Sequence, residues 1–315
     1  EGKCTVHASK GVHIVVPKER LDADAALCFV TEKSVLFVIP WGEYWIIGTT
    51  DTDWERGLSL PDPAPTAADI DYILEEVNQR VRTPLTHEDI VGVYSGLRPL
   101  LSGKSDSTSN LSRNHAVAVI APGLVSVAGG KYTTYRVIGK DAVDLAAEEL
   151  PGTVAESVTE KTPILGAAGY HALANQVPLL AQRYGGSEHI ITHLLGRYGS
   201  LIDEVLAPAS EEKSLLEPIP EAPGYLWAEA RYAVTHEGAL HLEDVLARRL
   251  RISIEYGHRG LDCASPVADF IAPLVGWSEE EKQAEVELFR SRTEAELAAE
   301  KALTDREAND IVVNA

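Results

Sequence analysis

The chain has 315 residues and a formal net charge of −20 at pH 7, with 45% hydrophobic and 6% aromatic residues. This length exceeds the usual size of one hydrophobic core, so two domains are expected, and the apolar content excludes a disordered chain. The acidic charge repels nucleic-acid phosphates, and the sequence has no cluster of Lys and Arg interleaved with aromatic residues. Nucleic-acid binding is therefore not expected.

The cysteines and the hydropathy pattern indicate a cytoplasmic protein. Cys4, Cys28 and Cys263 are odd in number and lack the spacing of a disulfide framework, which favours a reducing compartment. The sequence contains no apolar run of 18 or more residues. We therefore expect a cytoplasmic location, and a peripheral contact with the inner face of the cell membrane is left open.

The first half of the chain alternates short strands with turns. β-branched or aromatic runs bounded by Pro, Gly and charged residues predict strands at residues 12–16, 34–39, 44–49, 90–94 and 116–120. Gly42 and Glu43 predict a hairpin between the second and third of these. Thr66, with Asp69 three residues later, predicts the start of a helix.

The second half is rich in Ala, Leu and Glu at helical spacing, and residues 278–281 predict the start of a long helix. The predicted fold is therefore α+β, with a β-rich part at residues 1–150 followed by an all-α domain at residues 151–315.

The segment from Leu124 to Arg136 reads as a strand, a two-glycine turn at Gly129 and Gly130, and a helix that runs to about Leu150. Glycines at a helix N-terminus let backbone N–H groups approach an electronegative ligand. Neither a Walker A loop nor a G-x-G-x-x-G turn matches this segment. The alternative is an ordinary strand–turn–helix capped by Thr133 or Thr134.

Further blocks precede this turn in a fixed order. They are Lys10-Gly-Val-His-Ile-Val-Val-Pro17, Val38-Ile-Pro-Trp41, Ile46-Ile-Gly-Thr-Thr-Asp51 and Tyr94-Ser-Gly-Leu-Arg-Pro-Leu100. With the turn, they resemble the flavin-dependent, quinone-linked glycerol-3-phosphate dehydrogenases. Residues 232–249 are similar to the last domain of that family. The family's amino-terminal G-x-G-x-x-G unit is missing and Glu1 is not Met, so we expect the carboxy-terminal portion of a longer protein.

The resemblance implies an FAD-dependent oxidoreductase fold, with glycerol 3-phosphate as substrate, FAD as cofactor and a respiratory quinone as acceptor. An oxygen-using glycerol-3-phosphate oxidase is the alternative enzyme. An assembly module that is inactive in this form is the alternative of another class. A homodimer is left open.

Within this resemblance, His13 is the candidate catalytic base, because oxidation of an alcohol by hydride transfer requires removal of the hydroxyl proton. A strand histidine with only a structural role is one alternative, and a donor that orients the substrate hydroxyl without taking its proton is the other. An unperturbed imidazole would place the acidic limb of kcat/KM near pH 6.5.

Arg98 is the second candidate catalytic residue and is expected to contact the substrate phosphate or hydroxyl, because a guanidinium forms a planar fork that suits phosphate; an ordinary surface arginine is the alternative. Lys131 is also expected to bind the substrate phosphate, with the pyrimidine edge of the flavin as the alternative. The expected cofactor-binding residues are Gly96, Leu97, Gly129, Gly130, Lys131, Tyr132, Thr133 and Thr134, and the expected pocket residues are Thr49, Thr50 and Asp51. A helix N-terminus near Thr133 would place partial positive charge beside the flavin.

No metal site is expected. His236 and His241 are five residues apart, which separates them by about 140° on a helix and denies them a shared ligand face. His189 and His193 have helical spacing but lack a third ligand nearby in the sequence.

Overall fold

The computed structural model describes all residues except 1–5, 33, 55–61 and 102–113. Contacts divide the chain into two compact units, residues 1–162 with 295–315, and residues 163–294. The first unit is built on a sheet and the second is almost entirely helical, so the predicted α+β class is confirmed. The division into a flavin and substrate part at residues 1–150 and a helical domain at 151–315 stays a prediction. In the structure the last 21 residues are grouped with the first unit.

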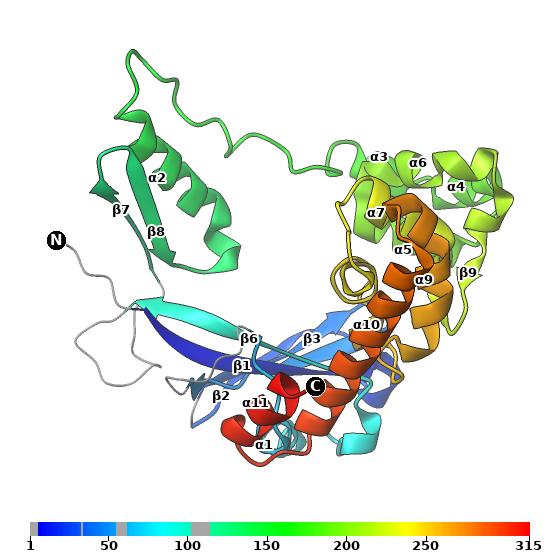
Figure 1. Ribbon diagram of the computed structural model, residues 1–315, viewed down its shortest axis with the longest axis horizontal. Helices are drawn as coiled ribbons and strands as arrows, with labels where there is room; N and C mark the ends of the chain where they lie inside the picture. The colour runs from blue at the N-terminus through cyan, green and yellow to red at the C-terminus, as the bar shows by residue number, and fades with distance from the viewer. Residues whose placement is uncertain (1–5, 33, 55–61, 102–113) are drawn as a thin grey trace. The chain divides into compact units, whose positions relative to one another are not determined.

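The sheet of the first unit is antiparallel and centred on β1 (Val6–Pro17). β4 (Tyr44–Gly48) and β5 (Thr52–Asp53) follow one another along one edge of β1, and β6 (Gly92–Leu101) pairs with it from Val6 to Val15 on the other edge. β3 (Val35–Trp41) and β2 (Leu27–Val30) extend the sheet beyond β4 (Figure 1). The predicted hairpin is present, and Gly42 in its turn has a positive φ of 59°.

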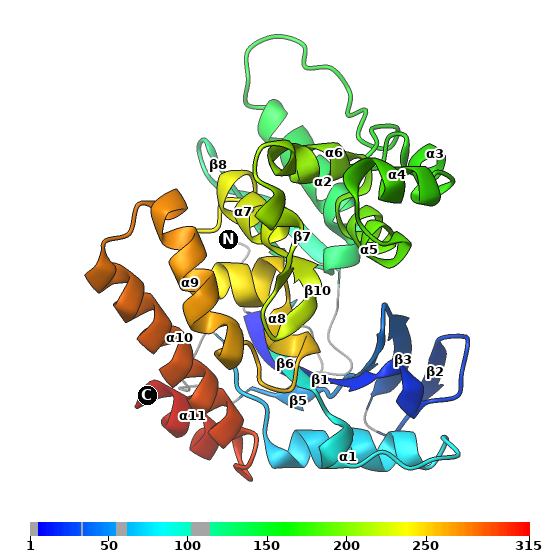
Figure 2. The same ribbon diagram turned by 90° about the vertical axis from the view of Figure 1, so that its right-hand side faces the viewer.

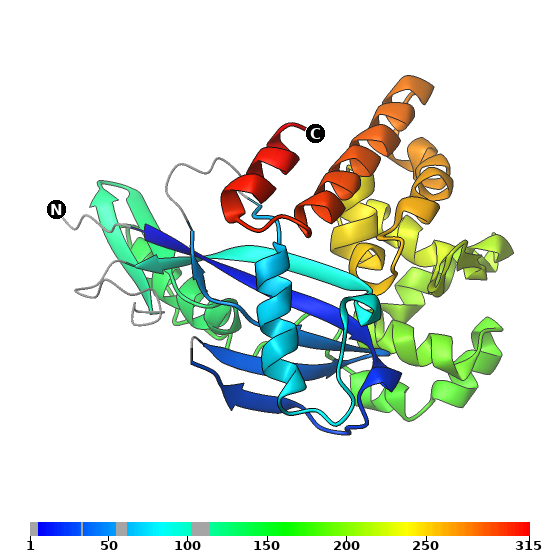
Figure 3. The ribbon, with the colours of Figure 1, turned by 90° about the horizontal axis from the view of Figure 1, so that it is seen from below.

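Helix α1 (Ala67–Asn78) covers one face of this sheet (Figure 3). Its predicted start is confirmed, because Thr66 and Asp69 form a reciprocal capping box. Alternate residues of the central strands face the helix, and the core between them is apolar. The core includes Val12, Ile14, Val16, Leu36, Val38, Trp45, Ile47, Ile70, Ile73, Leu74 and Val77.

A smaller part of the first unit is the hairpin of β7 (His115–Ala121) and β8 (Leu124–Gly129), with α2 (Tyr135–Ala147) lying along it (Figure 1). His115 Nε2 lies 2.7 Å from Asp141 Oδ2 and links β7 to the helix. The predicted helix after the glycine turn is therefore present, although it begins two residues later than expected and ends before Leu150. The sequence also predicts a polar loop at residues 103–110, which lies outside the described residues.

The second unit consists of short helices around two apolar cores (Figure 2). Its helices are α3 (Tyr170–Ala174), α4 (Val177–Tyr184), α5 (Glu188–Tyr198), α6 (Ile202–Leu206), α7 (Trp227–Thr235), α8 (Ile252–Glu255), α9 (Leu261–Val275) and most of α10 (Glu279–Ala299). One two-stranded ribbon, β9 (Pro218–Ile219) with β10 (Ala222–Leu226), was not predicted. The chain then returns to the first unit with α11 (Asp305–Val313).

Candidate active site

The side of the sheet away from α1 carries polar side chains and glycines where the opposite side carries the core. Because successive residues of a strand face opposite sides, Ser9, Gly11 and His13 of β1 share this face. The antiparallel register places three residues of β6 directly opposite them: His13 pairs with Tyr94, Gly11 with Gly96, and Ser9 with Arg98. Two of the predicted functional residues, His13 and Arg98, therefore lie on one face of adjacent strands.

The His13 ring is held between two neighbouring strands. It stacks on Tyr94 with ring centroids 4.9 Å apart and an angle of 8° between the planes. On its other side Gly48 is required, because a Cβ there would lie 2.6 Å from His13 Cδ2. Packing on both sides fixes the plane of the imidazole.

Burial, and to a smaller extent the nearby Arg98 guanidinium, lower the pKa of His13 to about 4. The expected titration near pH 6.5 is therefore wrong for the folded chain, because both causes are tertiary. At neutral pH the ring is uncharged and has one nitrogen that can accept a proton.

The Arg98 guanidinium lies across Gly11 of the neighbouring strand, where a Cβ would come within 2.1 Å of Arg98 Nη2. Nη2 donates to Thr49 Oγ1 at 2.6 Å and to the carbonyl of Thr50 at 3.1 Å. Nη1 lies 3.5 Å from Asp51 Oδ1. The three predicted pocket residues therefore hold the arginine in place, and about a quarter of its side chain stays exposed.

Ser9 completes this arrangement from β1. Its hydroxyl donates to Asp51 and lies 3.4 Å from Arg98 Nη1. Sequence reasoning missed both Ser9 and Tyr94. Strand alternation counted back from His13 would have placed Ser9 on the same face, and Tyr94 opens one of the blocks that carried the resemblance.

Gly96 and Leu97, both predicted to contact a cofactor, face opposite sides of the sheet. Apart from its chain neighbours, no atom of the described residues lies within 4 Å of the place where a Cβ on Gly96 would project. Leu97 pairs with Lys10, and alternation turns its side chain to the side of α1. Only the backbone of Leu97 faces the candidate site.

The glycine turn has the backbone that only glycine adopts readily. Gly129 has a φ of 73° and Gly130 a φ of 89°. Lys131 is exposed, and its carbonyl accepts a bond from Thr134 Oγ1 at 2.9 Å. A single 3-10 turn, Tyr132–Thr134, then precedes α2, which is why the α-helix starts later than the capping pattern predicted.

This turn lies at the far end of β6, because a Cβ on Gly129 would come within 2.9 Å of Leu101 Cγ. Leu101 follows Arg98 by three residues on the same strand. The structure thus brings His13, Arg98 and the residues from Thr49 to Asp51 together on the sheet. The turn with Lys131, Tyr132 and Thr133 forms a separate group at the end of the strand.

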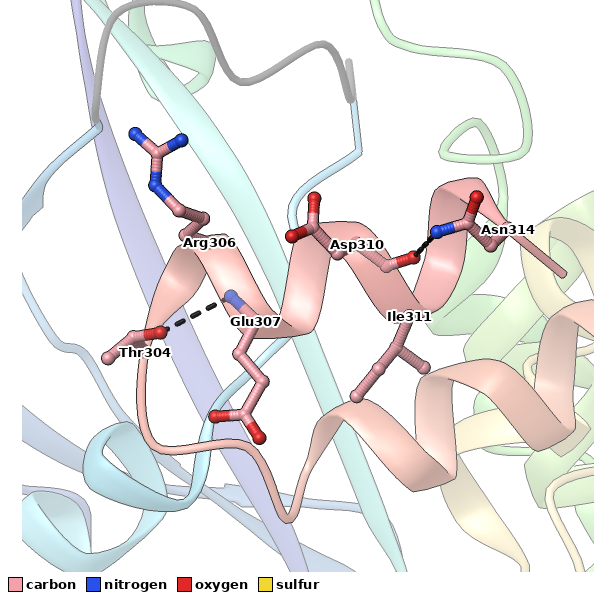
Figure 4. A pocket seen from close by; sticks show the side chains of 6 residues that line it. All are labelled: Thr304, Arg306, Glu307, Asp310, Ile311 and Asn314. Carbon is pink, nitrogen blue, oxygen red and sulfur yellow. Dashed lines mark hydrogen bonds between the residues drawn. The ribbon is translucent and has the colours of Figure 1, made fainter.

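A hollow on the surface lies elsewhere in the first unit. It follows α11 and is lined by Thr304, Arg306, Glu307, Asp310, Ile311 and Asn314 (Figure 4). Its bonds in Figure 4 link Thr304 to Glu307 and Asn314 to Asp310 within one helix. None of the candidate site residues lines it.

In the parts of the chain that the structure describes, no group of three or more His, Cys, Asp and Glu side chains could hold a metal ion. The His193 ring bonds Glu229 Oε1 at 3.0 Å. No helix within the described ranges is long and apolar enough to cross a membrane.

Residues 157–282 match the family model described as the C-terminal domain of alpha-glycerophosphate oxidase. This range covers most of the helical unit, and the site on the sheet lies outside it.

Whole-chain relatives are more specific. The chain is 59% identical over 299 residues to the glycerol-3-phosphate dehydrogenase of Mycobacterium leprae, which covers 95% of this chain and 51% of that protein. It is 30% identical over 306 residues to the mitochondrial glycerol-3-phosphate dehydrogenase of Mus musculus, covering 91% of this chain and 41% of the relative.

A solved structure extends the likeness to the fold. The glycerol-3-phosphate dehydrogenase from Bacillus halodurans, complexed with FAD, superimposes with a TM-score of 0.73 and 26% identity, over 92% of this chain and 57% of that one. These matches confirm the resemblance to FAD-dependent glycerol-3-phosphate dehydrogenases that the sequence blocks indicated. The chain spans about half the length of the curated bacterial relatives that it matches.

Proposed function

We propose that this chain forms the substrate side of an FAD-dependent glycerol-3-phosphate dehydrogenase, which oxidises sn-glycerol 3-phosphate to dihydroxyacetone phosphate. The observation that carries the proposal is the pairing of a neutral histidine and a braced arginine on one sheet face. The 59% identity to a protein of that name supports the choice of substrate. The electron acceptor is proposed to be a respiratory quinone, as the resemblance implies.

The two side chains have separate tasks. Arg98 offers a charged, planar donor group to the phosphate, and its bonds to Thr49 and Thr50 orient that group before substrate arrives. His13 accepts the hydroxyl proton, because its lowered pKa keeps the ring unprotonated at neutral pH. The Tyr94 stack holds the accepting ring in one orientation.

The residues present fit a flavin on this face. Gly96 is exposed and lacks a Cβ, which allows a flat ring to approach the backbone closely, and the left-handed turn at Gly129 and Gly130 exposes Lys131 beside the start of α2. When bound, the flavin would accept the hydride from the carbinol carbon. Gly96 and the turn from Gly129 to Thr134 are the residues that would hold it.

The test is flavin reduction by substrate in the full-length protein. Anaerobic addition of glycerol 3-phosphate should bleach the flavin absorbance, whereas glycerol, which lacks the phosphate, should bleach it far more slowly. Reoxidation by a soluble quinone but not by oxygen would support the dehydrogenase. Rapid reoxidation by oxygen would favour the oxidase, and no bleaching by glycerol 3-phosphate would refute the substrate assignment.

A further inference from the structure

A fully buried lysine lies directly behind the candidate site. Lys10 has no exposed surface, and its Nζ lies 2.5 Å from Asp69 Oδ2 and forms a second ion pair with Asp305. The carbonyl of Ala64 lies 3.5 Å from the same nitrogen. Two carboxylates and a carbonyl thus surround the three donors of the ammonium, which is the condition for burying a lysine.

Lys10 lies on β1 between Ser9 and Gly11, the two residues of that strand that contact Arg98 or its partner Asp51. Ser9 on one side donates to Asp51, and Gly11 on the other lies under the guanidinium. Alternation turns these two to the site face and Lys10 to the opposite face. Lys10 therefore does not contact the site, but its backbone is continuous with both supports.

The partners of Lys10 come from distant parts of the chain. Asp69 belongs to the capping box of α1, where it also accepts from the backbone N–H and the hydroxyl of Thr66. Asp305 lies in the first turn of α11, 295 residues after Lys10 in the sequence. The ammonium thus ties the starts of two helices to one residue of β1.

We propose that Lys10, Asp69 and Asp305 form a clamp that positions the anion site, with Lys10 as a positioning residue for Arg98. Held from behind, β1 keeps Ser9 and Gly11 at the distance from β6 that the guanidinium requires. The last helix of the chain then contributes to substrate affinity through Asp305, without contacting the substrate. This inference rests on the proposed function only for the identity of the anion.

Asp305→Asn tests the clamp, because it removes one charge from the cluster and keeps the size of the side chain. Asp310→Asn is the matched control, since Asp310 is exposed on the same helix. Binding of glycerol 3-phosphate and of inorganic phosphate to the full-length, FAD-loaded protein is measured by titration calorimetry. Asp305→Asn should weaken both affinities by about threefold to thirtyfold, the range expected for coupling through packed elements, and Asp310→Asn should not.

Steady-state kinetics separates positioning from general destabilisation. A positioning role predicts a raised KM for Asp305→Asn and an unchanged acidic limb of kcat/KM, because the His13 stack does not involve the clamp. Lys10→Met should raise KM further in the same direction. If Lys10→Met does not fold, Asp305→Asn decides the matter.

Two results would overturn the proposal in different ways. A lower melting temperature for Asp305→Asn with unchanged anion affinity would reduce the clamp to a stabilising ion pair. If instead Arg98→Lys binds both anions as tightly as the unaltered protein, the phosphate role of Arg98 itself fails, and with it the site that the clamp would position.

Discussion

Arg98 owes its orientation to groups that are 47 to 49 residues away in the sequence. Thr49, Thr50 and Asp51 surround its donors, and Gly11 leaves room for the guanidinium. A lysine at this place would keep the charge but lose the planar fork and its bonds to this loop. The hydrogen bonds to Thr49 and Thr50 and the ion pair with Asp51 thus hold the guanidinium in one orientation on the sheet face.

Arg98→Lys in the full-length protein should therefore raise KM for glycerol 3-phosphate and lower kcat/KM. The fall in kcat/KM should correspond to a loss of roughly 1.5–3 kcal/mol of transition-state stabilisation, the cost of a lost charged hydrogen bond. Flavin content should stay normal. Arg80→Lys, at a partly exposed arginine paired with Glu76, is the control and should change neither constant. Unchanged kinetics for Arg98→Lys would make it a structural residue only.

His13 should also leave a mark on stability that does not depend on catalysis. Its pKa falls from 6.5 in the unfolded chain to about 4 in the folded one, so the folded state binds fewer protons between these values. The free energy of unfolding should therefore rise as the pH rises from about 4 to 6.5. His13 accounts for at most about 3 kcal/mol of that rise.

Urea unfolding of this chain at a series of pH values measures that contribution. The stability of His13→Asn should rise less steeply than that of the unaltered chain across pH 4 to 6.5, because the carboxylates titrate equally in both. His189→Asn, at an exposed histidine on α5, is the matched control variant. Parallel curves for His13→Asn and the unaltered chain would show that the imidazole is not desolvated by folding.

Helix and strand boundaries that depend on neighbouring residues were predicted correctly from the sequence, whereas those that depend on residues distant along the chain were not. The Thr66 and Asp69 capping box and the hairpin at Gly42 depend on residues within a few positions of each other, and both are present. β1 was expected at residues 12–16 but extends from Val6 to Pro17, because β6 pairs with it far beyond the apolar run. Lys10 lies before that run, and its partners Asp69 and Asp305 could not be predicted from the sequence because they are distant along the chain.

The site shows the same division. The residue blocks indicated His13 and Arg98, but their alignment on one face depends on the register between β1 and β6. The lowered pKa of His13 depends on burial and on Arg98, so the unperturbed value misled. The turn at Gly129 and Gly130 was recognised from its glycines, whereas its place beside Leu101 is a tertiary contact.

Two opposed glycines on adjacent strands offer an element-scale test. A Cβ on Gly11 would collide with Arg98, whereas a Cβ on Gly96 would come within 4 Å of no described residue other than its chain neighbours. Gly11→Ala should therefore displace the guanidinium and weaken phosphate binding about as much as Arg98→Lys does. Gly96→Ala should leave chain stability unchanged to within about 0.5 kcal/mol, as at an unobstructed surface position.

Calorimetric titration with inorganic phosphate and thermal unfolding of both variants check this pair. Equal phosphate affinity for Gly11→Ala and the unaltered protein would contradict the close approach of Arg98 to β1.

At the scale of the molecule, the chain combines a sheet-based unit that carries the candidate site with a helical unit that matches the C-terminal domain of alpha-glycerophosphate oxidase. The chain spans about half the length of its bacterial relatives. We propose two roles for residues of this chain, phosphate binding by Arg98 and proton acceptance by His13. The role of His13 is the more critical one, because other cationic side chains can also bind a phosphate.

The role of His13 as the proton acceptor is tested by single-turnover reduction of the flavin in the full-length protein carrying His13→Asn. Asparagine keeps a donor of similar size and removes the basic nitrogen, so the rate should fall by about 10²–10⁴-fold while FAD retention stays normal. His189→Asn should react at the unaltered rate. In the unaltered protein the acidic limb of kcat/KM that belongs to His13 should lie near pH 4, because burial and Arg98 lower the pKa of the ring. A His13→Asn protein that reduces its flavin at the unaltered rate, with the same dependence on pH, would show that the base lies elsewhere.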